Sequence, residues 1–397
     1  MVRQQPLPAD TRLIASGTRP IIGALLAVAA VGLVVVACDR PAPNEPQQGS
    51  IAAARVPVGT ATPFATGLDN PRGLEFGPDG NLYVAEGGTG GTGSTVGQCD
   101  QVVAPVGPYT SGYTARISRI DAAGVRTTVV NNLPSSQTSP ALGSLVSGVG
   151  DVAFIGNTLY AVLAGAGCSH GIPDVPNGVI RVNGDGTWDL VADLSAFVAA
   201  HPVAQPEEDD FEPDGTWYSL VAARGELYAV EPNHGEIDRI TLNGNGPATV
   251  HRLVDVSATQ GHVVPTALAY HGNFYFSNLT TFPLVPGAAT VYQVTPAGVI
   301  PRSFGHLTGV LGLAFDQRGR LFALENTVCP SADPCGPTPG TGAVVMVRPD
   351  GTVSTVVSGL VFPTGMTMGP DGALYVSVSG FGFPAGAGEV VRIALTE

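Results

Sequence analysis

The sequence predicts an all-β fold in which one small unit is repeated around a ring. Three observations support this prediction: the chain is rich in turn-forming residues, it repeats one hairpin motif six times, and its last repeat lacks a final strand. Its 397 residues include 53 Gly and 34 Pro, and only 13% are charged. This composition is typical of many short strands joined by tight turns, and a chain of this length buries a large core.

The repeated motif is an apolar strand, a tight turn containing Gly with Asp or Asn, and a second strand centred on an aromatic residue. The first copy, NPRGLEFGPDGNLYVAE, starts at Asn70, and the last, FPTGMTMGPDGALYVS, starts at Phe362. Gly provides the positive φ that such hairpin turns require. The six aromatic residues are Tyr83, Tyr160, Tyr228, Tyr275, Phe322 and Tyr375.

A third strand follows every copy, and a fourth strand follows the first five. The sixth unit stops at GEVVRIALTE without a fourth strand, whereas TATPFATGL, just before the first copy, has the form of an isolated one. Pairing these two ends closes the ring and removes the exposed sheet edges. The pattern therefore predicts a six-bladed β-propeller of four-stranded blades, closed by an N-terminal strand, and not an open solenoid.

The N-terminal segment is typical of an exported protein. Three Arg residues precede an apolar run over residues 21–37, and the sequence VVAC ends at Cys38. A basic stretch, an apolar stretch and small residues before a break indicate a signal peptide, and VVAC resembles a lipobox that directs lipidation of Cys38. An uncleaved membrane anchor and free secretion are the alternatives. All three place the remaining chain outside the cytoplasm.

We therefore expect three segments: a signal peptide over residues 1–37, the lipidated Cys38 with a flexible tether over 38–61, and the propeller over 62–397. The protein would then be an extracytoplasmic, membrane-anchored lipoprotein, in the periplasm or at the cell surface, and a monomer. The chain has no Lys and a net charge of −14. Without a basic stripe, this charge argues against a nucleic-acid partner.

The two ends of the predicted ring differ in their loops. The turns between the first and second strands of the blades are minimal, so they leave one end of the ring bare. The opposite end carries the loops over residues 86–114, 131–148, 164–177, 193–216, 279–288, 326–341 and 379–387. Long loops on a rigid scaffold are common binding sites. We expect a small molecule, a glycan or a protein to bind at this long-loop end.

Four cysteines lie in these long loops. Cys329 and Cys335 would staple one loop, and Cys99 and Cys168 would join the loops of the first two blades. An oxidising compartment favours such disulfides. A cysteine metal site is the alternative, although the spacings lack a CxxC pair.

The residue three places after each repeat aromatic defines a column at the long-loop end. This column reads Glu86, Leu163, Glu231, Asn278, Glu325 and Val378. Four of these side chains bear oxygen, and three converging carboxylates would repel one another unless a cation such as Ca²⁺ lay between them. The alternative is that each side chain accepts hydrogen bonds from backbone amides of its own loop.

The short crossing EPNHGEID places Asn233 and His234 at the same end. A plain β-turn is one interpretation. The other is that Asn233 and His234 form the floor of a ligand site, with His234 as a general base or metal ligand. The acidic stretch from Glu207 reads as a solvated loop, with Ca²⁺ binding as the alternative. No G-x-S-x-G, HExxH or phosphate-binding glycine motif is present, so whether the protein is an enzyme stays open.

Several of these segments resemble the ScyD/ScyE family of six-bladed propellers. The similarity is carried by NPRGLEFGPDGNLYVAEGG, GTWYSLVAARGELYAVEPNHGEIDRI, PTALAYHGNFYFSNLTTFP, GVLGLAFDQRGRLFALE and FPTGMTMGPDGALYVSVSGFG, over about residues 62–395. The resemblance implies the fold and an extracytoplasmic setting, and it implies no reaction.

A broader likeness is to propellers of the gluconolactonase and NHL type. The metal-binding Glu-Gly-Pro of the lactonases has no counterpart here, because the corresponding column reads Arg72, Gly150, Tyr218, Thr266, Leu311 and Thr364. The leading hypothesis is therefore a binding lipoprotein that uses its long-loop end. The alternative is a Ca²⁺-dependent propeller hydrolase or lactonase, or a sugar dehydrogenase.

Overall fold

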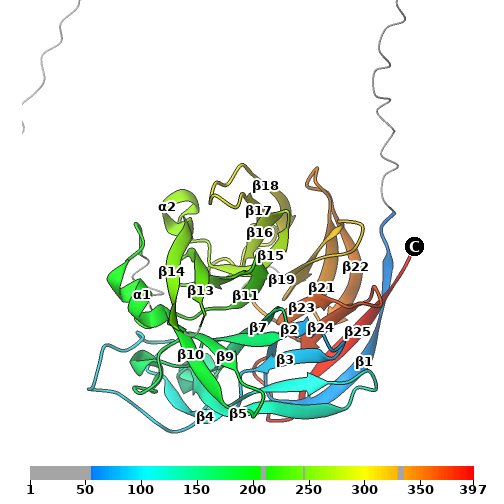
Figure 1. Ribbon diagram of the computed structural model, residues 1–397. Coiled ribbons are helices and arrows are strands. Elements are labelled where there is room, and N and C mark those ends of the chain that lie inside the picture. Colours follow the sequence, from blue (N-terminus) through cyan, green and yellow to red (C-terminus); the bar gives the residue numbers. More distant parts are fainter. Residues whose placement is uncertain (1–54, 207–211, 245, 330–334) are drawn as a thin grey trace, which may run out of the picture. The chain divides into compact units, whose positions relative to one another are not determined.

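A computed structural model of the protein describes residues 55–206, 212–244, 246–329 and 335–397. Six antiparallel sheets stand around a common axis and form a six-bladed β-propeller, as the repeats predict (Figure 1). The predicted signal peptide and Cys38 lie outside the described residues.

Blades 1 to 3 follow one another along the chain. Blade 1 contains β2 (Pro71–Phe76), β3 (Leu82–Glu86), β4 (Thr110–Ile120), β5 (Arg126–Gln137) and β6 (Val146–Ser147). Blade 2 contains β7 (Val149–Ile155), β8 (Thr158–Leu163), β9 (Gly178–Val182) and β10 (Trp188–Asp193). Blade 3 contains β11 (Ser219–Ala223), β12 (Glu226–Glu231), β13 (Glu236–Asn243) and β14 (Gly246–Asp255).

Blades 4 to 6 complete the ring. Blade 4 contains β15 (Pro265–His271), β16 (Asn273–Asn278), β17 (Ala289–Val294) and β18 (Arg302–Leu307). Blade 5 contains β19 (Val310–Phe315), β20 (Leu321–Glu325), β21 (Gly342–Val347) and β22 (Val353–Leu360). Blade 6 contains β23 (Gly365–Met368), β24 (Leu374–Val378), β25 (Gly388–Thr396) and β1 (Val58–Leu68).

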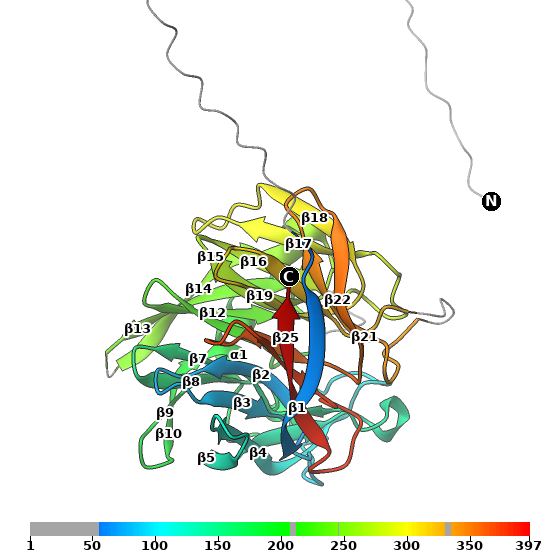
Figure 2. The same cartoon turned by 90° about the vertical axis from the view of Figure 1, so that its right-hand side faces the viewer.

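The ring closes where β1 pairs with β25, as predicted from the missing strand (Figure 2). The register runs from Val58 opposite Thr396 to Leu68 opposite Gly388. The first strand therefore begins at Val58, inside the segment predicted as tether. Because β1 covers the outer edge of blade 6, that blade is four-stranded like the others.

The core is divided into six apolar layers, one between each pair of neighbouring blades. Each layer is built from side chains that alternate along the strands of two adjacent sheets. Trp217, Phe274 and Phe322 are among the largest fully buried side chains. Burial of one such side chain contributes about 1.5–3 kcal/mol, so the layers hold the innermost strands in place around the axis.

Two short helices and one strand were not expected from the repeats. Helix α1 (Leu194–Ala200) follows Asp193, whose side chain accepts a hydrogen bond from the Ala196 N–H at 2.8 Å. Helix α2 (Val256–Gln260) is capped in the same way by Asp255. Two 3-10 turns, η1 (Pro140–Leu142) and η2 (Cys168–His170), also lie in long loops, and β6 adds a fifth strand to blade 1. Within the described ranges no helix is long and apolar enough to span a membrane.

Candidate functional site

The long loops leave the second strands of the blades and lead to the next strands outward, and other long segments lead into the innermost strands. Two disulfides brace this end of the molecule. Cys99–Cys168 joins a loop of blade 1 to a loop of blade 2, and Cys329–Cys335 closes a short loop of blade 5. Both are pairings that the sequence predicted. One disulfide thus ties two loops to each other, and the other closes a loop on itself.

Each oxygen-bearing residue of the second-strand column makes its hydrogen bonds inside its own blade. Three of them accept a backbone N–H from the segment that leads into the innermost strand: Asp69 to Glu86 at 2.6 Å, Thr216 to Glu231 at 2.8 Å, and Thr308 to Glu325 at 2.7 Å. The Asn278 side chain accepts the Thr290 N–H at 2.9 Å and donates to the Val263 carbonyl at 3.0 Å. The column therefore fastens each second strand to its neighbouring segments.

The column residues do not converge on a common centre. Among the described residues, no group of three or more His, Cys, Asp or Glu side chains is placed to hold a metal ion. The contacts of the column are those of the structural alternative, in which each side chain accepts hydrogen bonds from its own loop. Calcium binding by Glu86, Glu231, Asn278 and Glu325 stays a prediction that no contact in the structure supports.

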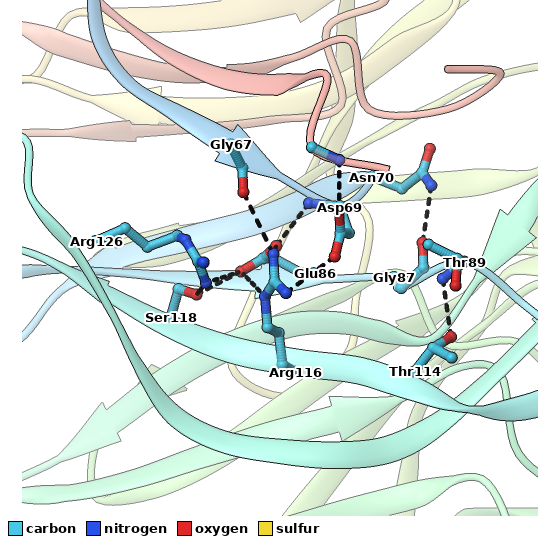
Figure 3. Close-up of polar contacts among 12 residues, drawn as sticks. Gly67, Asp69, Asn70, Glu86, Gly87, Thr89, Thr114, Arg116, Ser118 and Arg126 are labelled. Atoms are coloured by element: carbon cyan, nitrogen blue, oxygen red, sulfur yellow. Dashed lines mark hydrogen bonds and ion pairs between the residues drawn. The ribbon is translucent and has the colours of Figure 1, made fainter. Parts of the chain in front are cut away.

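Glu86 illustrates the local role (Figure 3). Its buried carboxylate accepts two hydrogen bonds from Arg116, at 2.8 and 2.7 Å, and one from the Ser118 hydroxyl. Arg116 also pairs with Asp69 at 2.9 Å, and Asp69 accepts the Gly386 N–H of blade 6 at 2.6 Å. This ion-pair network connects blade 1 to the seam where the ring closes.

Blade 3 holds a carboxylate in the same place with different neighbours. Glu236 stands opposite Glu231 in the register of β12 and β13, and Asp238 follows two residues later on the same face. All three side chains are buried. Arg252 donates to Glu236 and the Trp217 ring N–H donates to Asp238 at 3.1 Å.

Two carboxylate oxygens of this cluster, Oε1 of Glu236 and Oδ1 of Asp238, have no hydrogen-bond donor among the described residues. Burial raises the pKa of Glu236 to about 7, against the partial opposition of Arg252. Burial, reinforced by the charge of Glu236, also raises the pKa of Asp238. Burial raises the pKa of Glu231 as well. The cluster thus favours bound protons near neutral pH.

His234 lies beneath the long loops and not on their surface. It is 5% exposed, and its Nε2 lies 2.8 Å from the Glu212 carbonyl oxygen. The Glu212 carboxylate is bonded by Tyr109 at 2.8 Å, by His170 at 3.0 Å and by the Thr216 hydroxyl. This buried network joins loops of blades 1, 2 and 3. Asn233, beside His234, is only half-buried.

The axis of the ring is lined by the innermost strands. One small cavity lies on the axis and is lined by all six blades, and a second lies toward the long-loop end over blades 1 to 3. The upper cavity, at the long-loop end, has a volume of about 80 Å³ and is lined by Arg72, Ser147, Gly148, Val149, Gly150, Ala164, Thr216, Trp217 and Tyr218. The next cavity, of about 40 Å³, lies one layer further in and includes Asp151, Tyr218 and Thr364. A single water needs about 10–15 Å³ of such space, so the inner cavity admits water and not a sugar.

Two carboxylates cross-link the innermost strands around the inner cavity. Asp151 accepts the Leu220 N–H of blade 3 at 2.9 Å, and Glu75 accepts the Phe154 N–H of blade 2 at 3.2 Å. Enclosure away from water raises the pKa of Asp151 to about 7 and, with the charge of Asp151, that of Glu75 to about 8. A Cβ at Gly73 would lie 1.8 Å from the Asp151 carboxylate, so only glycine leaves room for it there.

The residues nearest the axis were visible in the repeats but not recognised as the site. Arg72, Tyr218 and Thr364 belong to the innermost-strand column of the repeats. Each of them lies at or directly before the start of an innermost strand. Because the innermost strands surround the axis of any propeller, that position in the repeat predicts residues near the axis.

Comparisons with known proteins support the fold alone. No family model and no curated protein matches the chain. Solved structures with a similar fold include a protein described as an oxidoreductase (glucose dehydrogenase) from Thermus thermophilus, with 17% identity, 85% of this chain and 100% of that chain covered, and a TM-score of 0.51. A protein of unknown function from Bacteroides thetaiotaomicron matches at 12% identity, 86% and 76% coverage, and a TM-score of 0.52. At such identities the shared feature is the propeller and not an activity.

Proposed function

We propose that this protein is an extracytoplasmic binding protein that holds a small molecule, a glycan or a protein partner at the long-loop end of its propeller. The proposal rests on the difference in loop length between the two ends of the ring. Minimal turns, such as the one around Gly80, form one end, whereas long loops braced by two disulfides form the other. Loops fixed on a rigid scaffold are suited to recognition, because little conformational entropy is lost on binding.

The test combines a thermal-shift screen with a footprint. The purified protein is screened against glycan fragments and small metabolites, and each compound that raises the Tm is examined by hydrogen–deuterium exchange. We expect protection of amides in the loops over residues 86–109 and 164–177, which Cys99–Cys168 connects. Protection confined to the hairpin turns at the opposite end would contradict the proposal.

We further propose that Cys38 is lipidated and anchors the protein at a membrane, as the lipobox-like VVAC supports. Intact mass measurement of the protein from its membrane fraction should show a diacylglyceryl group on an N-terminal Cys38. A Cys38→Ala variant should carry no lipid and should keep residues 1–37, because cleavage at a lipobox follows lipidation of its cysteine. A wild-type mass that retains residues 1–37 without a lipid would indicate an uncleaved apolar anchor instead.

We also propose that the chain is related to the ScyD/ScyE family. Its support is the sequence of the EPNHGE crossing, which begins at Glu231, and of FSNLTTFP, which begins at Phe276. If the resemblance is one of descent, solved structures of ScyD/ScyE proteins should show a Glu opposite a second Glu at the same place in blade 3. A different register at that place would count against it.

A catalytic function is the second candidate, and one observation favours it. Asp151 lines the inner axial cavity, which has room for water alone, and its pKa of about 7 suits a general base that activates such a water. Assays against lactones, esters and sugars, with and without Ca²⁺, would detect hydrolase or dehydrogenase activity. An activity that is lost in Asp151→Asn and rises with pH through neutrality would support this function over pure binding.

A further inference from the structure

The upper axial cavity contains one charged side chain, and that side chain is a cation. Arg72 lines it together with the polar Ser147 and Thr216 and the aromatic Trp217 and Tyr218, and none of its lining residues is acidic. The whole chain has a net charge of −14. An isolated positive charge in a hollow of an otherwise acidic protein gives that hollow a selective attraction for anions.

Arg72 has no carboxylate partner within 4.0 Å among the described residues, and other partly buried arginines do have one. Arg116 pairs with Glu86 and Asp69, and Arg252 pairs with Glu236. One Nη of the half-buried Arg72 donates to the Val146 carbonyl, which is a neutral acceptor. A charge partly removed from water without a counter-charge is costly unless a ligand supplies one.

The neighbouring phenol does not supply that counter-charge. Tyr218 contacts Arg72 and its hydroxyl donates to the Thr364 carbonyl at 2.7 Å. Burial raises the pKa of Tyr218 to about 12, so the phenol is neutral at physiological pH. Within 4.0 Å, the guanidinium therefore has no charged partner among the described residues.

We propose that the upper axial cavity binds the oxyanion group of a small molecule, a carboxylate or a phosphate, through Arg72, with the rest of the ligand lying among the long loops. The inference rests on the proposed binding function and narrows its ligand class. Arg presents a planar fork of donors that matches such groups and forms short charge-assisted hydrogen bonds with them. Ser147 also lines the cavity, and a serine hydroxyl can donate a hydrogen bond to such a group.

The experiment measures binding of acetate and inorganic phosphate to the full chain by calorimetry in a buffer free of other oxyanions, with neutral acetamide as the matched probe. The wild type should bind at least one of the two anions and should not bind acetamide. The anion that binds shows whether the oxyanion group of the ligand is a carboxylate or a phosphate. Equal binding of acetate and acetamide, or no binding of either anion, would overturn the inference without any substitution.

Variants locate the binding. Arg72→Gln should lose about tenfold or more in affinity for the anion, the usual weight of a charged hydrogen bond. Arg72→Lys, which keeps the charge but not the fork, should lose less. Arg224→Gln, which alters an exposed arginine in a hairpin turn at the opposite end, should bind like the wild type. Circular dichroism checks that each variant is folded.

The outcomes separate this inference from the proposed function. A larger ligand that protects the long loops and binds Arg72→Gln as tightly as the wild type would overturn the oxyanion site alone. Binding of acetate or phosphate that persists unchanged in Arg72→Gln would do the same. A failure of the proposed function would instead appear as ligands that protect only the opposite end of the ring.

Discussion

Blades 1 and 3 place a buried glutamate at the same position and surround it in opposite ways. In blade 1, Glu86 stands opposite Arg116, and Ser118 follows Arg116 by two residues on the same strand. The Glu86 carboxylate therefore accepts hydrogen bonds from a cation and a hydroxyl. In blade 3, Glu231 stands opposite Glu236, and Asp238 takes the place of Ser118. The comparison teaches that the column position is structural, because its backbone contacts are kept while the charges around it are reversed.

The largest expected effect comes from making blade 1 resemble blade 3. Arg116→Ala leaves the fully buried Glu86 without its bidentate partner, and we expect a loss of about 3–5 kcal/mol in the free energy of unfolding. Chemical denaturation measures it. The control is Arg181→Ala, which breaks the exposed pair with Asp189 and should cost less than about 1 kcal/mol. Equal losses in the two variants would contradict the burial argument.

The second effect is a pH dependence that blade 3 should show. Glu236 has a pKa of about 7 in the folded protein and about 4.5 when unfolded, so the folded state holds more protons between these values. Unfolding free energy should therefore fall as pH rises from about 4.5 to 7, by about 2–3 kcal/mol from this group. The difference between wild type and Glu236→Gln, measured by denaturation at several pH values, isolates it. Parallel pH profiles would show that Glu236 does not titrate differently on folding.

A smaller effect should come from relieving the repulsion in blade 3. Asp238→Asn removes the charge that interacts with Glu236 and replaces the unpartnered Oδ1 by an amide donor, while the amide oxygen still accepts from Trp217. We expect a gain of about 1 kcal/mol at pH 8 and none at pH 5, where the cluster is protonated. Ser118→Asp, the mirror change in blade 1, should destabilise at both pH values because Glu86 loses a donor.

The smallest effect concerns Ca²⁺. Since the column residues bond within separate blades, the Tm should be the same with added Ca²⁺ and with a chelator. A Ca²⁺-dependent rise in Tm that disappears in Glu231→Gln would revive the metal hypothesis for that residue. The same rise in wild type and Glu231→Gln would place the ion elsewhere.

The repeats predicted the fold well because hairpin turns and strand alternation are local. Two neighbouring strands, the second centred on an aromatic residue, and a Gly turn define a blade's inner half wherever they occur. The partners of the column residues were not predictable in the same way. Arg116 comes opposite Glu86 only through the register of two strands separated by a long loop, and a one-residue slip would have turned it to the other face.

The helices had a local signal that the repeat pattern conceals. DLSA at Asp193 and DVSA at Asp255 each put an aspartate three residues before the amide that it caps. The axial cavities had no such signal. Their residues come from the starts of several innermost strands, and only the closed ring shows that the cavity lined by Arg72 has no acidic lining residue.

The pairing of β1 with β25 also determines when, during synthesis, the ring can close. Thr62 meets Arg392, a partner 330 residues further along the chain. While the chain is being synthesised, β1 has no partner until β25 has emerged. Blades 1 to 5 are local and can form as they appear, but the ring has an open edge until then. We therefore expect a chaperone that binds this protein before the ring closes to bind the unpaired β1.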